Sequence, residues 1–260
     1  MNLINGKKIA EDILADLKKE IEQKELELCL AVILAGDDRV SHLYLQKKEE
    51  AAQKIGIKLK KHLLPLETSE QELSDLIDSL NNKPEVNGIL IQMPLPEHLS
   101  ADKIIQAIKP EKDVDGFLDK SRFNPPFILA IWQALESTGE NLKDKKILAL
   151  VNSDIFGRKL KYFFSQKRLK LEYLLGKEEE EITQADVIIT ALGQPEAIKE
   201  SMIKQGAILI DGGISRKNGK ISGDIDRKSV REKAKWLAPV PGGIGPLTVA
   251  FLFKNLIRSL

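Results

Sequence analysis

The sequence predicts an α/β protein with a parallel sheet in each half of the chain. Apolar runs of strand length alternate with segments whose apolar residues recur at helical spacing, which is typical of parallel sheets. The predicted strands are almost wholly apolar, and this favours sheets that helices cover on both faces. The alternation starts again near residue 146, and 260 residues suffice for two modest domains.

The first half begins with a helix, because apolar residues recur at helical spacing from residue 9 to 17. An apolar strand and a Gly-Asp-Asp turn follow, after which Ser41 is a good N-cap and Gly56 a good C′ residue for a second helix. Ser69 and Glu72 form a capping-box pair. The predicted strands span 28–35, 57–64 and 86–93, and the helices 9–17, 41–55, 69–80 and 100–108.

The second half repeats this alternation, in an arrangement of the kind that binds nucleotides. The predicted strands span 146–151, 169–175, 186–191 and 207–211, and the helices 127–134, 157–164 and 247–257. Six of the nine residues from 238 to 246 are proline or glycine. This composition predicts a loop whose backbone can approach a ligand closely.

Composition argues against several classes of function. A formal net charge of +1 gives no reason to expect nucleic acid or a membrane as a partner. No apolar stretch reaches transmembrane length and the N-terminus lacks a signal-peptide pattern, so a cytoplasmic location is expected. The three histidines lie far apart without partners at metal-ligand spacing, and no metal site is expected.

One predicted helix carries a lysine on its inward face. Tyr44, Lys48, Ala51, Ala52 and Ile55 share one stripe, and all except Lys48 suit a core. An ammonium pushed toward low dielectric has a lowered pKa, so Lys48 becomes a proton acceptor near neutral pH, and Tyr44 can orient a substrate. The alternative is that Lys48 lies at the edge of the stripe, with its stem packed and its head in water.

Polar residues also follow the predicted strands. In parallel sheets ligands collect at the carboxyl ends of the strands, and Gln92 lies at that edge. Asp113 and Asp115 flank an apolar residue before a glycine turn. A carboxylate in a loop usually makes a turn, and less often binds NH groups of a ligand. Gln92 likewise has the alternative role of fixing a neighbouring loop.

Together these motifs resemble the FolD family of bifunctional methylenetetrahydrofolate dehydrogenases and methenyltetrahydrofolate cyclohydrolases. Their order and spacing match along nearly the whole chain. The resemblance implies an N-terminal α/β catalytic domain over 1–122 and 242–260, to which the final helix returns, and a Rossmann-like NAD(P)-binding domain over 123–241. The matching motifs are Tyr44 with Lys48, Gly-Ile-Leu-Ile-Gln-Met-Pro at 88–94, Lys-Asp-Val-Asp-Gly-Phe at 112–117, Ala-Leu-Gly-Gln-Pro at 191–195, and the segments 206–214 and 239–246.

The resemblance implies two reactions on a tetrahydrofolate substrate at one site. A hydride passes from methylenetetrahydrofolate to a nicotinamide cofactor, and water then opens the methenyl ring to give formyltetrahydrofolate. Lys48 matches the catalytic lysine, which is the general base or acid of hydrolysis, and Gln92 matches the glutamine that hydrogen-bonds it. Tyr44 matches the tyrosine that stacks on the folate. Asp115 matches the aspartate that binds NH groups of the pterin. The loop that lines the folate site matches Pro241, Gly242 and Gly243.

For the cofactor, the resemblance implies NADP, while NAD or no nucleotide stays open. It also implies a homodimer. The residues that match cofactor-binding positions are Ser153, Gly157, Ala191, Gly193 and Ile214.

The sequence departs from the family in its cofactor motifs. Val-Asn-Ser at 151–153 replaces Gly-Arg-Ser, so the glycine that approaches the pyrophosphate and the arginine that can pair with the extra phosphate of NADP are missing. Arg158 and Lys177 are candidate replacements. Pro-Phe-Ile-Leu-Ala-Ile at 126–131 keeps only the first proline of a Pro-Cys-Thr-Pro-x-Gly stretch.

A further departure replaces a His-Ser-x-Thr segment with Leu-Leu-Gly-Lys at 174–177, followed by glutamates 178–181. These glutamates either repel a dinucleotide or form a solvated helix start. The leading hypothesis is therefore a methenyltetrahydrofolate cyclohydrolase acting through Lys48, with the dehydrogenase weak, altered in cofactor choice or lost. The alternatives are the fully bifunctional enzyme and a folate-binding protein without catalysis.

Overall fold

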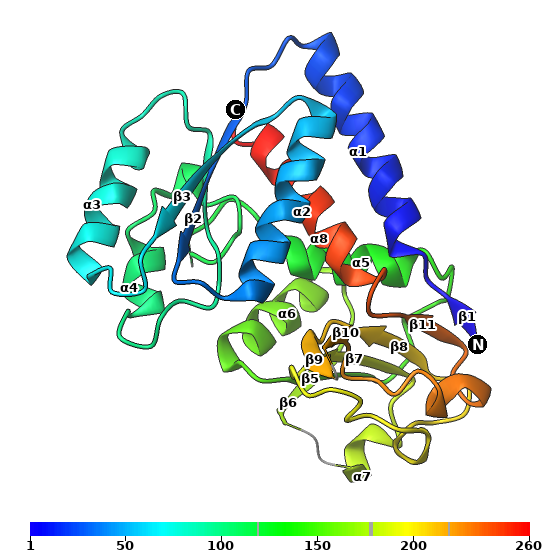
Figure 1. Cartoon of the computed structure of the whole chain (residues 1–260). Helices are drawn as coiled ribbons and strands as arrows, with labels where there is room; N and C mark the ends of the chain where they lie inside the picture. The colour runs from blue at the N-terminus through cyan, green and yellow to red at the C-terminus, as the bar shows by residue number, and fades with distance from the viewer. Residues whose placement is uncertain (119, 177–178, 218) are drawn as a thin grey trace. The chain divides into compact units, whose positions relative to one another are not determined.

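The computed structural model describes residues 1–118, 120–176, 179–217 and 219–260 (Figure 1). It divides into two compact units. The N-terminal unit comprises Ala10–Pro126 and Val249–Leu260, and the C-terminal unit comprises Met1–Ile9 and Phe127–Thr248. No helix in these described ranges combines the length and apolarity needed to cross a bilayer.

The sheet of the N-terminal unit has three parallel strands in the order β3-β2-β4. The central strand β2 (Cys29–Ala35) is buried throughout, with β3 (Lys58–Leu64) and β4 (Gly88–Ile91) beside it. Alternate β2 residues from Cys29 pack against α3 (Glu70–Asn81) and α4 (Ala101–Gln106). The intervening residues face the side of α2 (Arg39–Ile55) in Figure 1 and are also buried, so both faces of the sheet are covered, as predicted.

The predicted elements of this unit form, with shifted ends. α2 begins two residues before Ser41, because Asp38 is the N-cap and accepts a hydrogen bond from the Ser41 backbone N at 2.7 Å. The capping box of Ser69 and Glu72 is confirmed, and Gly56 caps the end of α2. β4 is shorter than the predicted strand over 86–93. The other helices here are α1 (Gly6–Gln23), whose first residues belong to the C-terminal unit, and the 3-10 turn η1 (Pro110–Lys112).

The sheet of the C-terminal unit has six parallel strands in the order β1-β11-β8-β7-β5-β6. The chain passes from β5 to β6 on one side and returns to β7 on the other, which makes a switch point between β5 and β7. The strands are β1 (Asn2–Leu3), β5 (Ile147–Val151), β6 (Leu171–Leu175), β7 (Val187–Ala191), β8 (Ile208–Asp211) and β11 (Trp236–Ala238), and the hairpin β9 (Ser215–Lys217) and β10 (Lys220–Ser222) stands apart.

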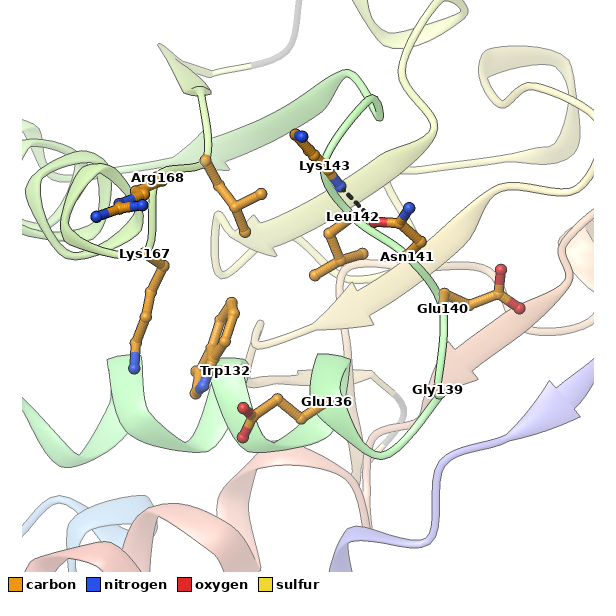
Figure 2. A pocket seen from close by; sticks show the side chains of 10 residues that line it. Trp132, Glu136, Gly139, Glu140, Asn141, Leu142, Lys143, Lys167 and Arg168 are labelled. Atoms are coloured by element: carbon orange, nitrogen blue, oxygen red, sulfur yellow. Dashed lines mark hydrogen bonds between the residues drawn. The ribbon is translucent and has the colours of Figure 1, made fainter.

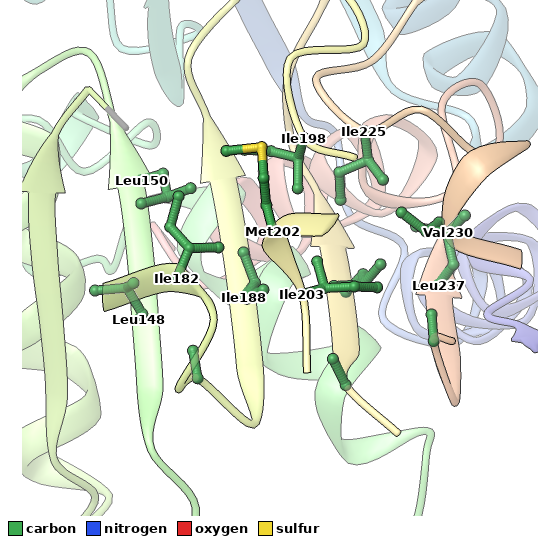
Figure 3. Close-up of a cluster of buried hydrophobic side chains, with 14 of the residues drawn as sticks. Leu148, Leu150, Ile182, Ile188, Ile198, Met202, Ile203, Ile225, Val230 and Leu237 are labelled. Carbon is green, nitrogen blue, oxygen red and sulfur yellow. The ribbon is translucent and has the colours of Figure 1, made fainter. Parts of the chain in front are cut away.

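A core of aliphatic side chains covers one face of this sheet (Figure 3). Leu148, Leu150, Ile188 and Leu237 project from the strands toward the connecting segments. Helices α5 (Pro126–Glu136) and α6 (Asp154–Gln166) contact each other through the edge-on rings of Trp132 and two phenylalanines. The remaining short elements are α7 (Glu179–Ile182), η2 (Glu200–Met202) and η3 (Ser229–Glu232).

The units differ from the predicted domains at three places, the first being the boundary after 122, since residues 123–126 belong to the N-terminal unit. Met1–Ile9 belongs to the C-terminal unit because β1 pairs with β11, and the Lys7 backbone N donates to the Gly242 carbonyl at 3.0 Å. Residues 242–248 belong there too. The end of α8 (Ile244–Ile257) returns to the N-terminal unit, as predicted, where Asn255 Nδ2 donates to the carbonyls of Val114 (2.9 Å) and Asn124 (3.0 Å).

Candidate active site

Lys48 and Gln92 meet at the carboxyl end of β4. The Lys48 Nζ donates to Gln92 Oε1 at 2.6 Å. Gln92 is held in turn, because its backbone N donates to the Ile33 carbonyl (2.8 Å) and its Nε2 donates to the Met93 carbonyl (2.9 Å). The Nε2 bond orients the amide so that its oxygen faces Lys48. Gln92 therefore presents a fixed acceptor to the lysine, and it does not serve only as a strand-end residue.

The two aspartates of the next loop have different roles. Asp113 is 1% exposed and makes the turn, since its carboxylate accepts from the backbone N of Phe117 (3.3 Å) and of Leu118 (2.9 Å). Asp115 is half-buried and interacts electrostatically with Lys48. No protein group in the described part of the chain hydrogen-bonds its carboxylate. Asp115 is thus the carboxylate that is left to accept NH groups of a ligand.

Burial shifts the pKa values of Lys48 and Asp115. Desolvation lowers the pKa of Lys48 to about 8, and the opposing effect is the negative charge of Asp115. Desolvation likewise raises the pKa of Asp115 to about 7, against the effect of Lys48 and with a contribution from Asp113. The amine is desolvated and bonds Gln92, which favours the inward-facing lysine over one with its head in water. Lys48 can therefore accept a proton near neutral pH.

Tyr44 lies one turn before Lys48 on α2. Its ring centroid is 5.9 Å from the Lys48 Nζ, and burial raises the pKa of its phenol, so it stays protonated. The half-buried ring supplies an apolar surface beside the amine. The structure thus brings together Lys48, Tyr44, Gln92 and Asp115, the four predicted catalytic residues.

The other predicted folate contacts, Pro241, Gly242 and Gly243, lie in the C-terminal unit. Within that unit the loop is held against the start of the chain, because a Cβ added to Gly6 would lie 1.9 Å from the Gly243 carbonyl oxygen. The Gly243 backbone N donates to the Pro239 carbonyl at 2.7 Å. Their contact with a folate stays a prediction.

The predicted cofactor residues gather at the carboxyl ends of β5, β7 and β8, on either side of the switch point. A Cβ added to Gly193 would lie 3.9 Å from Asn152 Nδ2 and 4.0 Å from the Ile214 carbonyl oxygen, so three loops converge there. Asn152 Nδ2 also donates to the Leu192 carbonyl at 3.2 Å, just beyond Ala191 at the end of β7. This is the edge at which open α/β sheets bind nucleotides.

The N-terminus of α6 follows β5 at this edge. Ser153 is the N-cap, and Asp154 occupies the first turn, where a pyrophosphate would bind. The Asp154 carboxylate accepts from the Tyr173 hydroxyl (2.7 Å) and pairs with Arg158 Nε (2.9 Å). Arg158, a candidate replacement for the lost arginine, is therefore already paired, and sequence reasoning did not single out Asp154.

Two other predictions concern this edge, one for Gly157 and one for Lys177 with the glutamates that follow it. Gly157 makes room for a ring, because an added Cβ would lie 2.4 Å from Tyr173, so packing within the unit requires this glycine. Lys177 and Glu178 lie outside the described residues, and of the glutamate run only the backbone of α7 and Glu181 are described. These loops lie at the edge where open α/β sheets bind dinucleotides, and the first turn of α6 carries the Asp154 carboxylate, which is paired with Arg158.

A cavity of about 600 Å³ lies in the same unit, away from this edge (Figure 2). Its lining residues at 139–143 lead into β5 and those at 167–169 into β6, so it lies where these strands begin. Trp132 points into it from α5, and the Lys167 Nζ lies 5.1 Å from the Trp132 ring centroid. None of the predicted site residues lines this cavity.

Comparison with known families covers nearly the whole chain. Residues 4–115 match the catalytic domain of tetrahydrofolate dehydrogenase/cyclohydrolase, and residues 125–260 match the NAD(P)-binding domain of the same family. The chain belongs to the tetrahydrofolate dehydrogenase/cyclohydrolase family. This confirms the resemblance seen in the sequence and places the chain among enzymes of folate one-carbon metabolism.

Relatives of this family match the chain from end to end. The bifunctional protein FolD of Moorella thermoacetica is 38% identical over 273 residues, which cover 99% of this chain and 98% of the relative. That of Aquifex aeolicus is 39% identical over 274 residues, covering 99% and 94%.

Solved structures of the family confirm the two-domain α/β fold. The bifunctional FolD of Campylobacter jejuni has a TM-score of 0.91 at 35% identity, with 100% of this chain and 98% of that chain covered. The Trypanosoma brucei FolD, solved with NADP and an inhibitor, has a TM-score of 0.93 at 26% identity, covering 99% and 96%.

Proposed function

We propose that this protein hydrolyses 5,10-methenyltetrahydrofolate to 10-formyltetrahydrofolate. The observation that carries the proposal is the desolvated Lys48, which is hydrogen-bonded to Gln92 at 2.6 Å and interacts electrostatically with Asp115. An amine with a pKa of about 8 is matched to proton transfer near neutral pH. Family membership supports the same reaction.

The geometry assigns each residue a step. Gln92 accepts one N–H of Lys48, which leaves the lone pair of the neutral amine free to take a proton from water. The water oxygen adds to the methenyl carbon, and Lys48 takes its proton. The bond from that carbon to the ring nitrogen N5 then breaks as the remaining hydroxyl proton is released to solvent and the formyl C=O forms, and Lys48 returns its proton to this nitrogen. Tyr44 stacks on the folate, and Asp115 accepts NH groups of the pterin.

The rate of hydrolysis, measured as kcat/KM, is expected to rise with pH through the range of about 7 to 8. Deprotonation of Lys48 (pKa about 8) and ionisation of Asp115 (pKa about 7) both produce the active form as pH increases. The decrease in methenyltetrahydrofolate absorbance from about pH 6 to 9, corrected for the uncatalysed rate, measures this. Lys48→Arg cannot deprotonate in this range, so it should lose the part of the rise near pH 8 that belongs to Lys48. A flat or falling profile in the parent protein would contradict the role of Lys48 as a base.

We further propose that the NADP-dependent oxidation of methylenetetrahydrofolate is weaker than hydrolysis. A bound nicotinamide would supply the hydride acceptor, and the N-terminus of α6 with the loops at Ala191 to Gly193 and Ile214 would hold it. The proposal is supported by Asp154 in the first turn of α6, where a helix end otherwise favours an anion. The absence of the family's arginine and glycine at 151–153 is also expected to weaken the NADP-dependent reaction.

Asp154→Asn is expected to tighten NADP binding by about two- to fivefold, because it removes a carboxylate from the helix end that would receive the phosphates and releases Arg158 from its ion pair. Calorimetric titration of the parent and the variant with NADP measures the change. Asp144→Asn is the matched control, because this exposed carboxylate precedes β5 at the opposite edge and should leave the affinity unchanged. Equal affinities of parent and Asp154→Asn would show that Asp154 does not face the nucleotide.

The second candidate is the fully bifunctional enzyme, which the end-to-end similarity to proteins named bifunctional FolD favours. Reduction of NADP and NAD with methylenetetrahydrofolate, beside hydrolysis in the same preparation, separates the two. Comparable rates select the bifunctional enzyme. Hydrolysis without nucleotide reduction selects the cyclohydrolase, and folate binding without either reaction would overturn both.

A homodimer and a cytoplasmic location also stay proposals, because they rest on family resemblance and composition. Analytical ultracentrifugation of the purified protein would test the first. Fractionation of the source cells would test the second.

A further inference from the structure

Two buried carboxylates in the C-terminal unit, Asp211 and Asp224, interlock the loops of the nucleotide edge. We propose that both are positioning residues, which hold the loops after β7 and β8 in the shape that receives a dinucleotide. This inference rests on the proposed nucleotide-binding function of that edge. Neither residue belongs to the predicted cofactor contacts.

Asp224 holds the loop after β7. It is 0% exposed, and its Oδ2 accepts from the Leu192 backbone N at 2.7 Å while its Oδ1 accepts from the Gln194 backbone N at 2.8 Å. The two donors flank Gly193, where an added Cβ would lie 3.9 Å from Asn152 Nδ2 and 4.0 Å from the Ile214 carbonyl oxygen. One carboxylate therefore determines the path of this loop through charge-assisted bonds to two backbone groups.

Asp211 holds the loop after β8 and the segment that carries Asp224. It is 2% exposed, and its Oδ1 accepts from the backbone N of Gly213 (3.1 Å) and of Asp224 (3.0 Å). Its Oδ2 accepts from the Ile225 backbone N at 3.0 Å, and the Thr190 hydroxyl lies 3.3 Å from Oδ1. Asp211 thus connects the ends of β7 and β8 to the Asp224 segment.

Two glycines make this interlock reciprocal. A Cβ added to Gly213 would lie 2.0 Å from the Asp224 carboxyl carbon, and one added to Gly223 would lie 2.0 Å from Asp211 Oδ2. Each aspartate therefore packs on the glycine beside the other aspartate. Real Cβ atoms do not approach so closely, so only glycine allows both carboxylates to reach their donors.

The carboxylates are not balanced by cations, which separates this pair from an ordinary ion-pair network. No lysine or arginine of the described residues pairs with either of them. Their charge is stabilised by backbone N–H groups of the loops, and a buried carboxylate needs such donors. The same hydrogen bonds therefore stabilise the two negative charges and fix the shape of the loops.

Asp224→Asn tests the proposal by replacing one carboxylate oxygen of Asp224 with an NH₂ group. Its two bonds use different oxygens, so an asparagine must turn an NH₂ group toward either the Leu192 or the Gln194 N–H. Asp226→Asn is the matched control, because Asp226 caps Lys228 N (3.1 Å) and Ser229 N (3.2 Å) through the same oxygen, which asparagine retains.

The experiment combines calorimetric titration with NADP and amide hydrogen exchange on the full chain, with circular dichroism to check folding. We expect Asp224→Asn to weaken NADP binding by about tenfold or more and to speed exchange at Leu192 and Gln194. Asp226→Asn should match the parent in both. A folded Asp224→Asn variant with the affinity and exchange rates of the parent overturns the proposal.

Two further outcomes also test the proposal. If Asp224→Asn does not fold, exchange in the parent is the test, and unprotected amides at Leu192, Gln194 and Gly213 overturn the interlock. If the parent binds neither NADP nor NAD, the proposed dehydrogenase function fails, and the role of the pair toward a nucleotide falls with it. Protected amides in that case would still show that the carboxylates hold the loops.

Discussion

Replacing Lys48 with methionine is expected to lower the rate of methenyltetrahydrofolate hydrolysis by a factor of about 10² to 10⁴. Methionine has a similar length and fills the same half-buried space, but it has no lone pair that can take the proton of the attacking water. Single-wavelength assays that follow the loss of methenyltetrahydrofolate absorbance measure the effect.

Lys47→Met is the matched control for this experiment. Lys47 is the preceding residue of α2, but it is exposed and its Nζ bonds Glu50 at 2.8 Å, so its replacement should leave the rate unchanged. If Lys48→Met hydrolyses the substrate at a rate close to that of the parent, the assignment of Lys48 as the proton acceptor is wrong.

Replacing Asp115 with asparagine is expected to raise KM for the folate by about 10- to 100-fold, because hydrogen bonds from ligand NH groups to a charged acceptor are strong. A second effect follows from its charge. Asp115 opposes the lowering of the Lys48 pKa, so its neutralisation should lower that pKa further and move the rise of the pH profile to lower pH.

Steady-state kinetics at several pH values measure both effects in the Asp115→Asn variant. Glu111→Gln is the control, because this exposed carboxylate lies in the same segment and should change neither KM nor the profile. A purely structural role for Asp115 would lower activity without moving the pH profile. Unchanged KM would refute the contact with the pterin.

The sequence was sufficient for the elements that position the site. Tyr44 and Lys48 share a stripe because helical spacing is a property of neighbouring residues, and the capping box at Ser69 is a local pair of hydrogen bonds. It was insufficient for β1 and β11, which have two and three residues and are too short to show a period. Their pairing is why Met1–Ile9 belongs to the C-terminal unit.

Within the site, sequence patterns proposed the residues but not what distinguishes them. The spacing does not distinguish Asp113 from Asp115, and only the family resemblance pointed to Asp115. The folded loop shows that Asp113 accepts the N–H groups of the turn, while Asp115 interacts electrostatically with Lys48. Asp154 did not stand out from other acidic residues, because its importance depends on its place in the first turn of α6. Asp211 and Asp224 did not stand out either, because their role depends on the loops that they bond in the folded unit.

By itself, then, the sequence determined the fold class and the family, and it predicted the group of Lys48, Tyr44, Gln92 and Asp115, since these depend on local periodicity and on motifs read along the chain. Only the tertiary structure showed which residue the Lys48 amine contacts and how its pKa is lowered. Lys48 and Gln92 are separated by 44 residues, yet their atoms lie 2.6 Å apart. Desolvation at that contact, which depends on everything packed around the amine, makes Lys48 a base.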